Sequence, residues 1–153
     1  MFFGLHEDKK MVDVLNPNQR RHCMTSIRTR NTDIELQVRR VLHARGFRFR
    51  VHRRNLAGKP DIVLPRYQQV VFVHGCFWHG HHCTRGKLPK TNAEFWAQKI
   101  SATKARDKRA VAALEAGGWN VSVIWECELE EGLSRLLKRL SSHRSSTPPK
   151  KIN

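Results

Sequence analysis

The sequence predicts an α/β fold in which a mixed central sheet is flanked by helices. The predicted elements run in the order helix, three strands, helix, strand, helix along the 153 residues. The run from Val70 to Val73 is apolar at every position, which is typical of a strand buried on both faces. A long helix expected over residues 93–116 would allow the last strand to pair in parallel with an earlier one.

Positive charge is spread over the whole chain. Lysine and arginine number 29 against 13 acidic residues, a formal net charge of +16. Because the basic residues recur from Arg20 to Arg144, we expect a polyanionic partner, with nucleic acid first, rather than one solvated basic tail. The apolar runs are too short to predict a membrane span, and we expect a cytoplasmic, nucleoid-associated protein.

The N-terminal region, residues 1–19, shows no sustained periodicity and is predicted to be a flexible arm, with Met1 or Met11 as the start. The single predicted domain spans residues 20–140, and a disordered basic tail is expected over 141–153. The basic segment 19–30 is long enough for a short helix that contacts phosphates.

The first helix of the domain is expected to begin at Thr32, since Thr32 and Glu35 fit a capping box, and to end before Gly46. Residues 47–51 alternate strictly between apolar and basic side chains, as in a half-buried strand. Strands 61–64 and 67–74 follow after short turns, so the three strands should form an antiparallel meander. Asn92 is placed to cap the long helix; strand 119–125 and an amphipathic helix over 129–140 complete the domain.

The stretch from Val73 to Cys83 holds two cysteines and four histidines in eleven residues. Cys76, Cys83 and the distant Cys127 would supply three thiolates to a structural zinc ion, and one of His79, His81 and His82 would complete a tetrahedral set. Parallel pairing of strand 119–125 with strand 67–74 would bring Cys127 near Cys76. Cys23 has no such partners and is expected to be an ordinary thiol.

Asp61 stands at the start of a strand, where its carboxylate is a candidate magnesium ligand; a turn aspartate after proline is the alternative. His79 is a candidate general base, although the spacing equally allows it to bind zinc. Asp107 could orient a histidine or form only a local ion pair, and Glu35 could serve only the capping box.

Two aromatic residues, Phe77 and Trp78, lie in the cysteine–histidine loop, and Trp96 lies early in the long helix. Core packing is the usual role of such side chains, and we expect it for Trp119 and Phe95. A loop held by a metal could instead present Phe77 and Trp78 as a wedge that opens a DNA base step. A mismatched step is already easier to open.

Together these motifs resemble the very short patch repair (Vsr) DNA mismatch endonucleases. The similarity covers about residues 11 to 130, and His74-Gly75-Cys76-Phe77-Trp78-His79 combined with Trp125-Glu126-Cys127 is its most specific signature. The other matching blocks are Met24-Thr25 to Glu35, Gly58-Lys59-Pro60-Asp61, His81 to Cys83, Asn92 to Ile100, Arg106-Asp107 and Gly118-Trp119.

The resemblance implies a restriction-endonuclease-like three-layer fold with a structural zinc. It implies a magnesium-dependent nick on the 5′ side of the thymine in T:G mismatches that arise by deamination of 5-methylcytosine. Double-stranded DNA with a T:G mismatch, mismatch-repair proteins and a cognate cytosine-5 methyltransferase are the implied partners, and the chain is expected to be a monomer.

The resemblance also assigns site residues by motif. Asp61 and the backbone carbonyl of Val73 would bind magnesium, and His79 would be the base. The supporting polar shell would be Glu35, His74 and Asp107. The zinc ligands would be Cys76, His81, Cys83 and Cys127. The intercalating side chains would be Phe77, Trp78 and Trp96, with Met24 helping from the N-terminal side.

The chain departs from the wider nuclease superfamily, which places an acidic residue and a lysine on the strand after the Pro-Asp motif. Here that strand reads Phe72-Val73-His74, so neither group is present, and Val73 replaces a threonine found in some Vsr enzymes. Two alternatives remain at this stage: a non-catalytic zinc-stabilised DNA-binding protein, and a general restriction or junction nuclease of the same fold.

Overall fold

The computed structural model describes residues 16–26 and 30–146; the side chains of residues 20, 23–26 and 145–146 are outside this description. The helices are α1 (Pro17–Ser26), α2 (Asp33–Ala44), α3 (Ala93–Ala116) and α4 (Leu129–Ser146). The strands are β1 (Arg50–Val51), β2 (Ile62–Leu64), β3 (Gln69–His74) and β4 (Asn120–Trp125). The short 3-10 helices are η1 (Pro65–Tyr67), η2 (Thr84–Gly86) and η3 (Glu126–Glu128).

The strands form one mixed sheet in the order β1-β2-β3-β4. The first two pairings are antiparallel, which confirms the predicted meander. β3 and β4 are parallel, with Gln69 opposite Asn120 and His74 opposite Trp125, and α3 forms the crossover between them. The predicted parallel pairing is therefore confirmed, and β3 and β4 end side by side.

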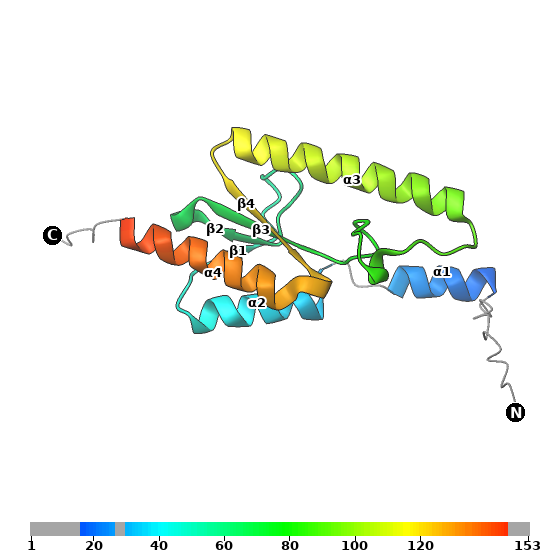
Figure 1. The fold of residues 1–153 in the computed structure, drawn as a ribbon, viewed down its shortest axis with the longest axis horizontal. Coiled ribbons are helices and arrows are strands. Elements are labelled where there is room, and N and C mark those ends of the chain that lie inside the picture. The colour runs from blue at the N-terminus through cyan, green and yellow to red at the C-terminus, as the bar shows by residue number, and fades with distance from the viewer. Residues whose placement is uncertain (1–15, 27–29, 147–153) are drawn as a thin grey trace, which may run out of the picture.

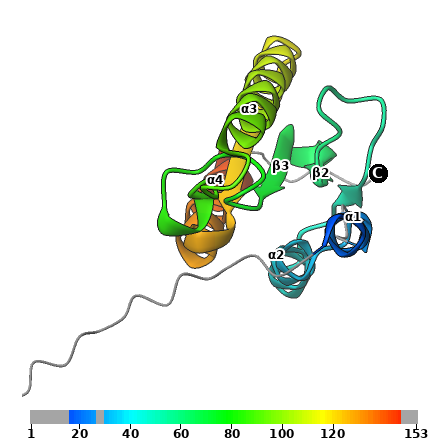
Figure 2. The same cartoon turned by 90° about the vertical axis from the view of Figure 1, so that its right-hand side faces the viewer.

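Helices cover both faces of the sheet, giving three layers (Figure 1). On one face, Ile62, Val71 and Ile124 pack with α2 and α4; on the other, Val63 and Val70 pack with α3. In the perpendicular view, α2 lies below β2 and β3 while α3 extends upward beside them (Figure 2). The period-2 alternation of strand side chains explains this division, because neighbouring residues face opposite layers. The predicted α/β class is confirmed.

The largest differences from the predicted boundaries are at β1, α1 and α4. β1 contains only Arg50 and Val51, although Phe47 is buried as its alternation predicted. α1 begins at Pro17, inside the predicted arm, because Asn16 and Gln19 exchange backbone–side-chain hydrogen bonds of 2.9 and 2.8 Å, a reciprocal cap that sequence reasoning missed.

The third difference lies at the C-terminal end. α4 continues to Ser146, so residues 141–146 are helical where a disordered tail was predicted. The Arg144 guanidinium lies 4.7 Å from the centre of the buried Phe47 ring, a cation–π contact that ties this last turn to the core. Residues 147–153 are outside the described part, as are residues 1–15 of the arm. Within it, no helix is both long and apolar enough to cross a bilayer.

The loop before Asp61 packs closely on α3. Gly58 has a φ of +68°, and a Cβ atom there would lie 2.6 Å from the Cβ of Ala110 and 3.1 Å from the Phe72 ring. Position 58 therefore requires glycine for two reasons: the left-handed backbone conformation and the close approach of Ala110 and Phe72. This contact fixes the position of the chain that carries Asp61.

We predict that Gly58→Ala destabilises the protein by about 1–3 kcal/mol more than Gly118→Ala. Gly118 is the matched control, since its φ is +85° but a Cβ atom added there would have nothing within 4 Å. Both variants strain the left-handed backbone, and only Gly58→Ala adds the steric overlap. Urea unfolding of the two variants measures the difference; equal losses would show that the loop does not depend on this contact.

Candidate active site and metal centre

A cluster of three thiols and one imidazole lies where β3 and β4 end. One ligand atom from each of Cys76, His81, Cys83 and Cys127 lies within 4.8 Å of the others. The Sγ of Cys127 is 3.4 Å from Nδ1 of His81. The loop is shaped by the His81 N–H, which donates to the Cys76 carbonyl at 2.9 Å. Residues far apart in sequence thus converge on one point.

The donor set fits a soft divalent cation. Cys76, Cys83 and Cys127 are free thiols, and sulfur and imidazole are the ligands that zinc takes in tetrahedral structural sites. The structure selects His81 among the three histidines that spacing left open; neither His79 nor His82 is in the cluster. Nε2 of His81 lies 3.9 Å from Oε1 of Glu128, a charge contact that is longer than a hydrogen bond.

The thiols have unequal proton affinities. The hydrogen bond from His81 lowers the pKa of Cys83 to about 6. Desolvation and then the neighbouring thiols of Cys76 and Cys83 raise the pKa of Cys127 to about 12. Three thiolates at this spacing would repel one another, so a bound cation must displace protons as it binds, and the affinity of the cluster for metal should weaken as the pH is lowered.

A second cluster joins His74, His79 and Asp107 on the α3 side of the sheet. The rings of His74 and His79 stack with 3.7 Å between centroids and 2° between planes. Nδ1 of His79 lies 2.6 Å from Oδ2 of Asp107. A carboxylate only accepts, so Nδ1 carries the proton and Nε2 of neutral His79 is left as an acceptor.

His74 is held neutral beside this pair. Burial is the main reason that the pKa of His74 is lowered to about 4; the coulombic effect of the neighbouring His79 ring adds to the shift, while Asp107 opposes it. A neutral His74 stacks on His79 without adding a second positive charge. The arrangement of acceptor nitrogen, orienting carboxylate and neutral neighbour suits a general base.

Asp61 lies one residue before β2 and reaches across to β3. Its Oδ2 accepts a 2.7 Å hydrogen bond from the Val73 N–H, which leaves Oδ1 for another partner. Burial is the main reason that the pKa of Asp61 is raised to about 6; Glu35 adds to the rise, while the Val73 N–H and the charge of Arg39 oppose it. A hard cation that takes one or two carboxylates fits this position.

Glu35 is buried in a network that sequence reasoning missed. Its carboxylate accepts hydrogen bonds from the Asn31 N–H and from Nη2 of Arg39, each at 3.0 Å, and from the Thr32 hydroxyl at 3.2 Å. The predicted N-cap at Thr32 is confirmed by a 3.3 Å bond from the Glu35 N–H, but the return bond of the capping box goes to Asn31.

Arg39 supplies a cation beside the two acidic residues. Its Nη1 donates to Oδ1 of Asn31 at 2.8 Å, and Nη2 lies 3.3 Å from Nε2 of His52. Asn31 and His52 both have left-handed backbones, with φ of 53° and 52°. Two residues in costly backbone conformations thus contact one guanidinium group. The charge of this guanidinium acts on Asp61. It provides a positive charge in a site where β3 has no lysine. The sequence gives little indication of this network, since Asn31 and His52 are far apart along the chain.

The aromatic residues of the loop and of α3 form one cluster. Trp96 lies 5.1 Å from Phe77 and 6.0 Å from Trp78, and Phe77 and Trp78 are 5.0 Å apart, all edge to face. These three rings are partly exposed, so they are not core residues. Phe95 was predicted to be buried, which is wrong: 56% of it is exposed, because it lies on the outer face of the first turn of α3.

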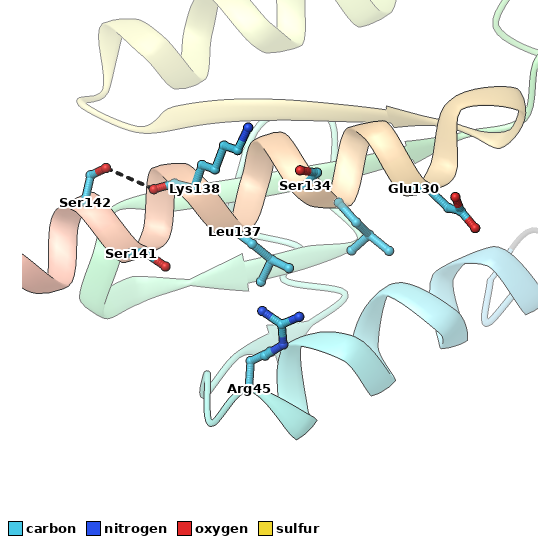
Figure 3. A pocket seen from close by; sticks show the side chains of 8 residues that line it. Arg45, Glu130, Ser134, Leu137, Lys138, Ser141 and Ser142 are labelled. Atoms are coloured by element: carbon cyan, nitrogen blue, oxygen red, sulfur yellow. Dashed lines mark hydrogen bonds between the residues drawn. The ribbon is translucent and has the colours of Figure 1, made fainter.

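Some predicted features lie elsewhere or outside the described residues. The side chain of Met24 is among the latter. Asn92 is at the N-cap of α3 but makes no side-chain capping bond. A shallow groove between the end of α2 and α4 contains none of the candidate site residues (Figure 3). Its lining is Arg45, Glu130, Leu133, Ser134, Leu137, Lys138, Ser141 and Ser142.

Comparison with known proteins gives the family. A family model described as DNA mismatch endonuclease Vsr matches residues 12–85. Over 121 residues the chain is 53% identical to the type II nicking enzyme V.XorIIP of Xanthomonas oryzae, covering 79% of this chain and 89% of the relative. The chain belongs to the Vsr family of DNA mismatch endonucleases.

Two further relatives support the same assignment. The Escherichia coli protein named DNA mismatch endonuclease Vsr is 44% identical over 119 residues, covering 78% of this chain and 76% of the relative. The type II nicking enzyme V.NmeAIP of Neisseria meningitidis is 42% identical over 136 residues, covering 85% and 97%. This Vsr-family chain is therefore a DNA endonuclease, and the alternative of a non-catalytic DNA-binding protein is set aside.

We predict that Asp61→Asn is more stable than the wild type at pH 8 and that this advantage shrinks toward pH 4. The folded protein binds the Asp61 proton more tightly than the unfolded chain does, so stability falls as pH rises from about 4 to about 6 and the carboxyl group ionises. Asparagine stays neutral and still accepts the Val73 N–H.

Denaturant unfolding in magnesium-free buffer at a series of pH values measures this effect. Asp33→Asn, at an exposed position of α2, is the control and should not show the same pH dependence. An Asp61→Asn variant that is less stable than the wild type at pH 8, with no loss at pH 4, would contradict the burial argument.

Proposed function

We propose that this Vsr-family endonuclease nicks DNA on the 5′ side of the thymine in T:G mismatches formed by 5-methylcytosine deamination, and so initiates very short patch repair. The proposal is carried by the His79–Asp107 hydrogen bond of 2.6 Å. The His79 ring stacks on that of His74, the last residue of β3. The residue before His74, Val73, donates its backbone N–H to Asp61, so the two groups lie close to one another. The three helix–sheet–helix layers support a restriction-endonuclease-like fold for the same chain.

In the proposed reaction, Nε2 of His79 takes a proton from the attacking water, while Asp107 fixes the ring through Nδ1 and stabilises the imidazolium that forms. His74 limits the rotation of His79 by stacking on it. Asp61, with the backbone carbonyl of Val73, would hold the magnesium ion, which when bound stabilises charge on the phosphate. Glu35 acts on Asp61 through its charge, and Arg39 balances that charge.

Cys76, His81, Cys83 and Cys127 would hold a zinc ion, which when bound supplies cross-linking and no chemistry. Their role is to join the loop after β3 to η3, so that His79 is presented to Asp107 and the neighbouring aromatic rings are held together. Phe77, Trp78 and Trp96 would then open a base step from one side. Met24 is assigned to the same step by motif alone.

Mismatch selectivity follows from the cost of opening that step. Unstacking a base step costs about a few kcal/mol of free energy, and this cost is lower for a poorly paired T:G step than for a matched step. This function calls for two kinds of partner: mismatch-repair proteins, and a cytosine-5 methyltransferase whose 5-methylcytosine product gives T:G on deamination.

We predict that the wild type, incubated with magnesium and a duplex carrying one T:G pair in a methyltransferase site, makes one nick in the T strand. His79→Ala should slow nicking at least about 100-fold, since a positioned base contributes about 100- to 10,000-fold. His43→Ala, an exposed histidine on α2, is the matched control and should retain activity.

Matched duplexes and a four-way junction of the same sequence test specificity in the same assay. A rate on matched or branched DNA equal to the rate on T:G would favour a general restriction or junction nuclease and contradict the proposal. An unchanged rate for His79→Ala would remove His79 from the chemistry.

A further inference from the structure

Phe95 has more exposed surface than a core residue and no role in the reaction described above. At 56% it is the most exposed of the large hydrophobic side chains in the part of the chain that the structure describes. A single exposed apolar side chain is ordinary. The position of Phe95 is unusual, because its ring continues a row of aromatic rings.

The Phe95 ring lies 5.3 Å from Trp96, edge to face. Trp96 contacts Phe77 at 5.1 Å, and Phe77 contacts Trp78 at 5.0 Å. The row therefore leads from the cysteine–histidine loop to the outer face of α3. Phe95 stands at the outer end of this row, where 56% of it is exposed.

Lys99 adds positive charge to the same face. Its Nζ lies 5.8 Å from the centre of the Phe95 ring and 5.5 Å from that of Trp96. Residues 95 and 99 are four apart and 96 and 99 three apart, so all three side chains share one face of the helix. An aromatic face with an ammonium group beside it matches a nucleotide, which presents a base or sugar next to a phosphate.

The charge of the whole chain favours the same partner. A net charge of +16 attracts a polyanion, and an acidic or apolar protein segment would leave the base-stacking geometry of the row unused. We propose that Phe95 and Lys99 form an outer DNA contact, in which Phe95 packs against the nucleotide flanking the opened step and Lys99 binds the adjacent phosphate. This inference rests on the proposed function, since it assumes that the neighbouring rings open the duplex.

The test measures the dissociation constant of the full chain for a T:G duplex by fluorescence anisotropy, and the single-turnover nicking rate with magnesium. Phe95→Ala should weaken binding about tenfold, the size expected for loss of one base–aromatic stack. Phe95→Leu should weaken it less. Lys99→Gln should lower the slope of log Kd against log salt by about one, as expected for one lost phosphate contact. At saturating enzyme, the nicking rate of each variant should stay near the wild-type rate.

Val51→Ala is the control for loss of an exposed apolar side chain, since Val51 is 40% exposed on β1, the strand at the other edge of the sheet from β4. It should bind DNA as the wild type does. Because Phe95 is exposed, its substitution should leave the unfolding midpoint unchanged, which separates a DNA contact from a structural role.

If Phe95→Ala binds as tightly as the wild type while Trp96→Ala binds weakly, the outer contact is absent and the proposed function stands. A wild type that binds T:G and matched duplexes equally and nicks neither would overturn the proposed function and this inference together. A shifted unfolding midpoint for Phe95→Ala with unchanged salt dependence for Lys99→Gln would also overturn the inference.

Discussion

The parallel pairing of β3 with β4 is the constraint on which the rest of the site depends. With His74 opposite Trp125, the two strands end together, and the chain that leaves each of them carries candidate metal ligands. Cys76 and Cys127 are distant in sequence and meet only because of this register. A shift by one residue would turn His74 away from His79 and Asp107, since successive side chains of a strand face opposite layers. The sheet register thus positions both clusters at once.

Charge balance is the second organising feature. Asp61 is partly buried, and the charge of the buried Glu35 adds to the cost of ionising Asp61. Arg39 offsets part of this cost through its 3.0 Å contact with Glu35, and a hard cation at Asp61 would offset more. In the second cluster, burial and then the coulombic effect of His79 lower the pKa of His74 to about 4, so His74 is neutral at pH 7. Each cluster therefore pairs acidic with basic groups, Arg39 with Glu35 in one and His79 with Asp107 in the other.

The elements that the sequence predicted best are those in which pattern and spacing act locally. Short turns predicted the antiparallel meander. The parallel pairing predicted across the long α3 helix placed Cys127 near Cys76. Spacing alone left His79, His81 and His82 open, and only the family resemblance indicated His81; Gly80, with φ of +64° against α3, lies between His79 and His81. Phe95 was misplaced because helical spacing alone does not say which face of α3 meets the sheet. The Asn31–Arg39–His52 network required contacts between left-handed residues that no sequence window contains.

We propose that the cysteine–histidine cluster is a scaffold and that the chemistry belongs to the separate Asp61–His79 centre. The most direct measurement is zinc content and magnesium-dependent nicking determined on the same preparations of the wild type, Cys127→Ser and His79→Ala. We expect about one zinc per chain in the wild type and in His79→Ala, which should not nick, and loss of zinc in Cys127→Ser. Loss of zinc from His79→Ala, or full zinc in Cys127→Ser, would contradict this division of roles.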